Sequence, residues 1–476
     1  MLRYSPKISK ISLSICFFLT TILLISILSV AAPAATVNIT PGQSIQNAVN
    51  NNPPGTTFEI AAGTYRQQSI VAKAGDVFIG AAGADLNGAT LVTGFTKSTF
   101  WVAHINISYP SSLPGQCFNW APMCAYPEDL YVNNNLYQRV GSLSAMSSQH
   151  WYLDYSSGNV YLMDDPTGQN VEVATTTYAF WGNASNVTIQ GLIIEKYANP
   201  GQTGAIEPMN AALAQGSNWV VQNNEIRYNH AAGIEGTTGM QIQYNNIHHN
   251  GELGIAASGD NILVGDNKIN YNNTVGYNFG FGAGGAKFDQ TNNLVVRYNT
   301  VIGNYGAGLH SDTYSTNGLY EYNYTSGNQV AGILYEISSY AVIRNNTIVN
   351  DGYDFQGSGP WWGAGIYNLN SSNVEVYSNT VTNCMHGITG ANSLRVDVNG
   401  IIFQVQNYSV HDNVVTQQTG VAVGILTLVS GDLIYTSWGN SFKNNSYNLA
   451  GGGSALDYYW MGRNLNFASW QSYGLD

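Results

Sequence analysis

The feature that most constrains this sequence is a short element, Asn-x-[Ile/Val/Thr], that recurs through its second half. Its copies begin at Asn224, Asn245, Asn267, Asn299, Asn323, Asn346, Asn379 and Asn413, at intervals of 21 to 34 residues. A glycine followed by Ile, Leu or Ala comes after each copy, at Gly233, Gly254, Gly285, Gly308, Gly332, Gly365, Gly387 and Gly424. A repeat with a period of about 20–50 residues indicates a solenoid, in which each unit packs only on its neighbours.

The content of the repeat predicts strands. Short β-branched runs such as LVVRYN, AVIRNN and NVEVYSN alternate with Asn and Gly turns. A leucine-rich repeat would need leucines at fixed spacing, and these are absent. A right-handed parallel β-helix places aliphatic side chains inside and stacks asparagines in its turns, so it fits better. We therefore predict an all-β chain whose main body has three strands per coil.

The flanking segments predict caps and one insertion. We expect an export signal at 1–35, an N-terminal cap and first coils at 36–97, an inserted β-rich subdomain at 98–178, the main β-helix at 179–430 and a C-terminal cap at 431–476. A short helix is predicted at Ser44–Val49. The run WYLDYSSGNVYLM at 151–163 predicts a hairpin inside the insertion.

The first residues are typical of a signal peptide. Three basic residues precede an uncharged run over 11–30, and the small residues AAPAA follow. This predicts a secreted protein, with an uncleaved membrane anchor as the alternative, because 20 apolar residues can span a bilayer. Removal of the signal leaves 13 basic residues against 28 acidic ones, a net charge of −15. That balance argues against nucleic acid or an anionic membrane as a partner.

Cysteine usage agrees with export. Cys117 and Cys124 lie close together in CFNWAPMC and are expected to pair in an oxidising compartment. Cys384 lies inside a repeat and is expected to stay unpaired and buried. The spacing does not resemble a zinc site, and no metal is required by the sequence.

The fold has a known counterpart. The stretch TPGQSIQNAV…GTTFEIAAGTY, the Asn-x-Ile coils and the insertion resemble the pectin-lyase-like right-handed parallel β-helix proteins. Those proteins include hydrolases, lyases, epimerases and phage tailspikes, so the fold alone does not give the function. The resemblance implies a poly- or oligosaccharide as the partner.

An acid recurs at one position of three consecutive coils. The sequences GAKFD (285–289), GLHSD (308–312) and GILYE (332–336) place Asp289, Asp312 and Glu336 four residues after a glycine. The residue after the glycine is mostly Ile or Leu and should point inward, so the second and fourth residues point outward together. One outward face should then also carry Lys287 and His310. Stacked coils are about 4.8 Å apart, a carboxylate spacing that suits a retaining glycosidase.

Two long loops bracket these acids and predict sugar contacts. One covers 272–284 and the other 351–365, and aromatic rings bind the apolar faces of sugars. The aromatic residues assigned to substrate binding, with Lys287 and His310, are Tyr277, Phe281, Tyr353, Trp361 and Trp362.

The central coils also resemble the β-helix β-xylosidases, which are glycoside hydrolases. The matching features are Gly-Leu-x-x-Asp, then one coil later Tyr-Glu followed by IRNN. The resemblance implies that Asp312 is the nucleophile and Glu336 the acid/base, with Asp289 assisting. His310 departs from the pattern, since an aromatic residue is expected there. Repulsion among three stacked acids should favour one protonated acid near neutral pH, and we assign that role to Glu336.

Two other functions remain open from the sequence. A polysaccharide lyase or uronate C5-epimerase could hold Ca²⁺ on the three acids and use Lys287 as the base. A non-catalytic, glycan-binding surface β-helix would explain the repeats but not the local acids. Glu207 and Glu235 are interpreted as isolated, solvated residues.

Overall fold

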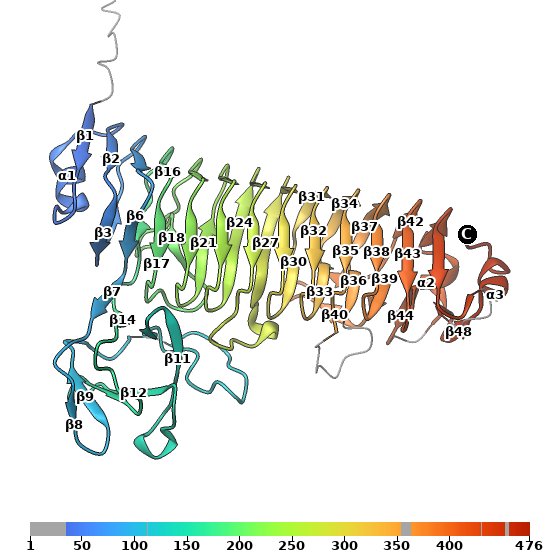
Figure 1. The fold of residues 1–476 in the computed structure, drawn as a ribbon. Helices are drawn as coiled ribbons and strands as arrows, with labels where there is room; N and C mark the ends of the chain where they lie inside the picture. Colours follow the sequence, from blue (N-terminus) through green and yellow to red (C-terminus); the bar gives the residue numbers. More distant parts are fainter. Residues whose placement is uncertain (1–34, 112, 354–362, 430, 453–456) are drawn as a thin grey trace, which may run out of the picture. The chain divides into compact units, whose positions relative to one another are not determined.

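The computed structural model describes residues 35–111, 113–353, 363–429, 431–452 and 457–476. The repeats wind into stacked coils of three strands, and equivalent strands of successive coils pair in parallel (Figure 1). The predicted right-handed parallel β-helix is therefore confirmed. The predicted signal peptide lies outside the described residues.

The coils present three faces, and the first face carries the acids. Its strands are β4 (Ile70–Val71), β15 (Phe180–Trp181), β18 (Gly204–Glu207), β21 (Ala232–Gly236), β24 (Leu253–Asp260), β27 (Gly284–Asn292), β30 (Ala307–Asp312), β33 (Ala331–Glu336), β36 (Ala364–Leu369), β39 (His386–Asn392), β44 (Val423–Thr427) and β47 (Tyr458–Trp460).

The second face continues from the first. Its strands are β1 (Thr36–Ile39), β2 (Thr57–Ile60), β5 (Val77–Gly80), β16 (Thr188–Gln190), β19 (Val220–Gln222), β22 (Gln241–Gln243), β25 (Leu263–Gly265), β28 (Val295–Arg297), β31 (Thr316–Glu321), β34 (Ser339–Arg344), β37 (Ser372–Tyr377), β42 (Ser409–His411) and β45 (Ser441–Lys443).

The third face closes the coil. Its strands are β3 (Gly63–Arg66), β6 (Ala84–Asn87), β17 (Ile193–Glu195), β20 (Glu225–Arg227), β23 (Asn246–His248), β26 (Lys268–Asn270), β29 (Thr300–Ile302), β32 (Tyr324–Ser326), β35 (Thr347–Val349), β38 (Thr380–Thr382), β43 (Val414–Gln417) and β46 (Ser446–Leu449).

The repeated asparagines form a hydrogen-bonded ladder in the turn between the second and third faces. Asn299 donates its backbone N–H and its Nδ2 to the Oδ1 of Asn323, at 3.1 and 3.0 Å. The same pattern links each asparagine of the repeat to its counterpart in the next coil. The ladder satisfies buried polar groups along the whole solenoid, which explains the recurrence of asparagine.

A second ladder runs through the turn that leads to the first face. It consists of Asn229, Asn250, Asn272, Asn304 and Asn328, and it ends on Asp351. The sequence analysis did not single out this column. Its last carboxyl group replaces a carboxamide and is fully buried.

An eight-stranded sheet forms the inserted lobe. Its strands, in the order of pairing, are β7 (Ala89–Leu91), β14 (Val171–Ala174), β10 (Leu130–Val132), β11 (Asn135–Arg139), β12 (His150–Asp154), β13 (Asn159–Leu162), β9 (Trp101–His104) and β8 (Thr96–Lys97). The sheet begins at Ala89, before the expected boundary at residue 98. β12 and β13 pair antiparallel, so the predicted hairpin is confirmed.

Caps close both ends of the solenoid. Helix α1 (Ile45–Asn51) begins at Ser44, whose side chain accepts from the Asn47 N–H. The C-terminal segment contains α2 (Leu433–Thr436), β48 (Arg463–Leu465) and α3 (Phe467–Gln471). There the Asp476 carboxylate accepts the last bonds of the first asparagine ladder.

The cysteines behave as predicted. Cys117 and Cys124 form a disulfide, while Cys384 is a free, buried thiol. Among the helices of the described residues, none is both long and apolar enough to cross a membrane.

Candidate active site

The three predicted acids lie on the outward side of neighbouring strands β27, β30 and β33. Asp289 pairs with Asp312 in register, and Ser311 pairs with Tyr335, which sets Asp312 beside Glu336. Leu309 and Ile333, which stand three residues before Asp312 and Glu336 on the same strands, belong to the buried core. Neither carboxylate points into the interior, because the side-chain alternation of a strand puts the neighbouring residue there.

The carboxylates of Asp312 and Glu336 approach each other closely. One oxygen of each, together with a ring nitrogen of His310, lies within 4.8 Å of the other two. The side chain of Asp312 is 15% exposed and that of Glu336 is 8% exposed. The pair is therefore mostly shielded from water, although it faces outward.

Lys287 compensates the first two acids. Its Nζ lies 3.1 Å from Asp312 Oδ2 and 3.6 Å from Asp289 Oδ2. The backbone N–H of Thr313 also donates to Asp312 Oδ1 at 2.8 Å. Asp289 thus contacts Lys287, and we find no bond between it and His310 among the described residues.

The charges on Asp312 and Lys287 support one another. Burial opposes the ionised form of Asp312, but His310, Lys287 and the hydrogen bonds outweigh it and lower the pKa of this carboxyl. Burial likewise opposes the charge on Lys287, but Asp289 and Asp312 raise its pKa above the ordinary value. Asp289 differs, since burial raises its pKa. Asp312 is therefore held as a carboxylate beside a protonated lysine.

Glu336 contacts two nitrogen-bearing side chains, those of Arg395 and His310. Its Oε1 accepts from a guanidinium nitrogen of Arg395 at 2.7 Å, and its Oε2 lies 3.3 Å from His310 Nε2. That histidine nitrogen is buried and makes no well-directed hydrogen bond within the described residues. It is available to a ligand that enters between the two acids.

The sequence analysis missed Arg395. This residue lies on a small antiparallel hairpin, β40 (Arg395–Val396) with β41 (Ile402–Phe403), that leaves the coil between β39 and β42. The three strands per coil that the sequence predicts do not include this antiparallel hairpin. The hairpin follows no repeat, and Arg395 is 59 residues from Glu336, so no periodic signal marks it.

The aromatic residues predicted to bind substrate differ in their exposure to solvent. Tyr277 is fully buried, so its predicted sugar contact is wrong. Its ring stacks on Phe281, which occupies one face of that ring. Tyr353 is 49% exposed and free to meet a ligand. Trp361 and Trp362 lie outside the described residues.

Tyr277 is buried because the lobe covers its loop. The Cys117 backbone bridges to Tyr277, and the N–H groups of Phe118 and Asn278 bond to Gly276 and Gln116. The loop 272–284 is therefore attached to the lobe through the backbone of residues 276–278. It passes next to Lys287, where the Gly282 backbone lies against the lysine chain.

Two further acids lie on the first face toward the N-terminus, in the column of Lys287 and not in that of Asp289. Ile206 pairs with Ile234, so Glu207 and Glu235 are neighbours on β18 and β21, and the interpretation of them as isolated residues was wrong. Burial raises the pKa of Glu207 to about 7. Burial and then the charge of Glu207 raise the pKa of Glu235.

The residues do not fit a calcium ion well. Ca²⁺ takes about six to eight oxygen ligands, whereas the cluster that could hold an ion offers one imidazole nitrogen and two carboxylates, His310, Asp312 and Glu336. Lys287 and Arg395 already supply positive charge at 3.1 and 2.7 Å from these carboxylates. We therefore derive no step through a metal.

Comparisons with known proteins agree on the fold. Residues 210–381 match the family model described as right handed beta helix region. A solved structure of XylC with xylose has a TM-score of 0.65 at 14% identity, covering 87% of this chain and 82% of that chain. The A-module of the Azotobacter vinelandii mannuronan C-5 epimerase AlgE4 has a TM-score of 0.52 at 12% identity, covering 85% of this chain and 89% of that chain. No curated protein sequence matches.

Proposed function

We propose that the chain is a carbohydrate-active enzyme, a retaining glycoside hydrolase that uses Asp312 as the nucleophile and Glu336 as the acid/base. The observation that carries the proposal is the approach of these two carboxylates on adjacent strands to within 4.8 Å. Retaining glycosidases hold their carboxyl groups about 5–5.5 Å apart, while inverting ones need about 6.5–9.5 Å to admit a water.

The environment of each acid matches its role. Asp312 is kept ionised by Lys287 and His310, as a nucleophile must be. It would attack the anomeric carbon while Glu336 gives a proton to the leaving oxygen. Glu336 would then take a proton from the water that cleaves the glycosyl-enzyme bond. Before the first step Glu336 needs a proton. Arg395, whose side chain is 45% exposed, must therefore move away from the Glu336 carboxylate when substrate enters.

The solved structure of XylC with xylose adds support, because it is a complex of a sugar with a protein of similar fold. The disulfide between Cys117 and Cys124 agrees with the predicted export, since such bonds persist in oxidising compartments. We infer that the substrate is a poly- or oligosaccharide outside the cell.

A uronate epimerase or lyase is the second candidate, favoured by the similarity to the AlgE4 A-module. In that case Lys287 would act as the base. Its raised pKa argues against this role, because a base must be unprotonated near the working pH.

Incubation with a panel of plant and algal glycans tests the proposal. We expect new reducing ends with no absorbance from unsaturated uronates, and a first product that retains the anomeric configuration by NMR. Asp312→Asn and Glu336→Gln should each lower turnover by orders of magnitude without unfolding the protein, since both keep the shape of the side chain. Asp260→Asn, at an exposed carboxylate on β24, is the matched control. Unsaturated products, or an inverted anomer, would contradict the proposal.

A further inference from the structure

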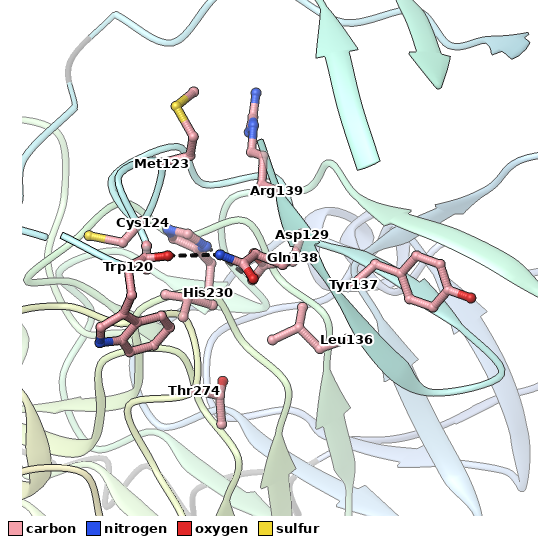
Figure 2. Close-up of a pocket in the computed structure, with 12 residues that line it drawn as sticks. Trp120, Met123, Cys124, Asp129, Leu136, Tyr137, Gln138, Arg139, His230 and Thr274 are labelled. Carbon is pink, nitrogen blue, oxygen red and sulfur yellow. Dashed lines mark hydrogen bonds and ion pairs between the residues drawn. The ribbon is translucent and has the colours of Figure 1, made fainter. Parts of the chain in front are cut away.

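A cavity lies where the inserted lobe meets the β-helix, away from the acid pair. It has a volume of about 190 Å³. The lobe contributes β11 and the disulfide-closed loop, and the β-helix contributes a turn and the start of loop 272–284. The lining residues used below are Trp120, Asp129, Leu136, Gln138, His230 and Thr274 (Figure 2).

A buried hydrogen-bonded chain stiffens one wall of this cavity. The hydroxyl of Tyr277 lies 3.1 Å from His230 Nε2, and His230 Nδ1 lies 3.0 Å from Asp129 Oδ2. All three side chains are at least nine-tenths buried. Because a phenol donates to Nε2, the Nδ1–H is left to donate to the carboxylate. The acid is therefore fixed in place by a partner from the β-helix.

The lobe side of the cavity is fixed as well. The disulfide closes the loop that carries Trp120, and the Nε2 of Gln138 donates to the Trp120 carbonyl at 2.8 Å (Figure 2). Leu136 and Gln138 lie on the same strand, β11. The cavity is thus formed before any ligand arrives, which is usual for small-molecule sites.

Three polar groups of the cavity can accept a hydrogen bond from a ligand. Among the described residues, the carboxamide oxygen of Gln138, Asp129 Oδ1 and the Thr274 hydroxyl have no protein partner, whereas the one lining cation, Arg139, is paired with Glu128 at 2.9 Å. A neutral ligand with several hydroxyl groups suits these acceptors, and the Asp129 carboxylate disfavours an anion. Sugar hydroxyls meet this need, and an indole ring suits the apolar face of a sugar.

The size of the cavity limits the ligand to one ring. A cavity of about 150 Å³ is enough to hold benzene, so 190 Å³ has room for one six-membered sugar ring. We propose that the junction cavity is an accessory site that binds one neutral sugar residue, separate from Asp312 and Glu336. Loop 272–284 walls both sites, since Thr274 lines the cavity and Gly282 lies against Lys287.

Binding measurements on a catalytically silenced chain test this inference independently of the proposed hydrolysis. D-xylose, D-glucose and D-glucuronate are titrated calorimetrically into full-length protein that carries Asp312→Asn and Glu336→Gln. We expect saturable binding of at least one neutral sugar and much weaker binding of glucuronate. In that background Leu136→Trp should fill the cavity and weaken binding at least about tenfold, which is about 1.4 kcal/mol. Leu143→Trp, on the exposed surface of the lobe, should leave binding unchanged.

Three outcomes would overturn the inference. These are the absence of saturable neutral-sugar binding, glucuronate binding as tight as that of neutral sugars, and unchanged affinity in a folded Leu136→Trp protein. If Leu136→Trp fails to fold, Thr274→Val decides the matter, because it removes the hydroxyl at constant shape. A severalfold loss of affinity then supports the site, and no loss refutes it.

Discussion

The buried carboxyl of Asp351 should make the stability of the solenoid depend on pH. Asp351 ends the second ladder, where every earlier position is asparagine. Its Oδ1 accepts from Asn328 N and Nδ2 at 2.7 and 2.9 Å, and its Oδ2 accepts from the Thr325 hydroxyl at 2.6 Å. No cation lies among these partners. Burial therefore dominates and raises the pKa of Asp351 to about 7.

The sign of the effect follows from the two states. An unfolded Asp has a pKa of about 3.9, so between about pH 4 and 7 the unfolded chain gives up its proton while the folded one keeps it. The free energy of unfolding therefore falls as the pH rises through this window, and the loss is complete above the pKa of Asp351 in the folded state. A difference of about three pKa units corresponds to roughly 4 kcal/mol. Asp351→Asn removes the penalty, and its amide can take the acceptor and donor roles of the earlier asparagines.

Denaturation at pH 4 and pH 8 measures the effect. We expect Asp351→Asn to match the parent at pH 4 and to exceed it by up to roughly 4 kcal/mol at pH 8. Asn304→Asp, at a ladder position that does not bond to Asp351, is the reverse change, and it should introduce a loss at pH 8. Hydrogen exchange at the Asn328 amide follows the local opening in case the solenoid does not unfold in one step. An equal difference at both pH values, or a less stable Asp351→Asn at pH 8, would refute the reasoning.

Three further predictions concern the acids and the first ladder. Lys287→Met should lower turnover and move the acidic limb of the kcat/KM profile to higher pH, because Asp312 loses a cation that favours its ionised form; an unmoved limb contradicts this. Arg395→Gln should lower turnover, because it removes the guanidinium that bonds Glu336 Oε1 at 2.7 Å, and turnover equal to that of the parent would speak against the assigned role. Asn323→Ala should cost roughly 3 kcal/mol or more in chemical denaturation, since it strands buried donors and acceptors in two coils; a loss below about 1 kcal/mol would show that the ladder is dispensable.

The fold and the placement of the acid pair were accessible from sequence because both depend on periodic patterns. The asparagines mark the turns, and strand alternation fixes which residues point outward. The same reasoning did not find that Glu207 and Glu235 are neighbours, because alignment by glycine does not bring them together. Gly204 in fact pairs with Ala232, so the two acids are equivalent although they stand at different offsets from a glycine.

Contacts outside the repeats could not be predicted in this way. Tyr277 is buried because a disulfide-closed loop of the lobe pairs with its backbone. Both segments are irregular, so their sequences have no periodic pattern that would predict this pairing. Arg395 likewise comes from a hairpin that has no counterpart in the other coils as far as the structure describes them. Such contacts depend on how loops fold back, which neither hydrophobic period nor turn chemistry encodes.

The charge distribution around Glu336 gives Arg395 a specific part in the proposed reaction. An arginine at 2.7 Å favours the carboxylate, which is the form needed in the second, base-catalysed step. The first step needs the protonated form, so the arginine has to move away before it. Arg395 lies on an exposed hairpin, while His310 and Lys287 are on the rigid coils, so it is the cation best placed to move. A sugar that displaces Arg395 would thereby prepare Glu336 as an acid, and the return of Arg395 would favour the base.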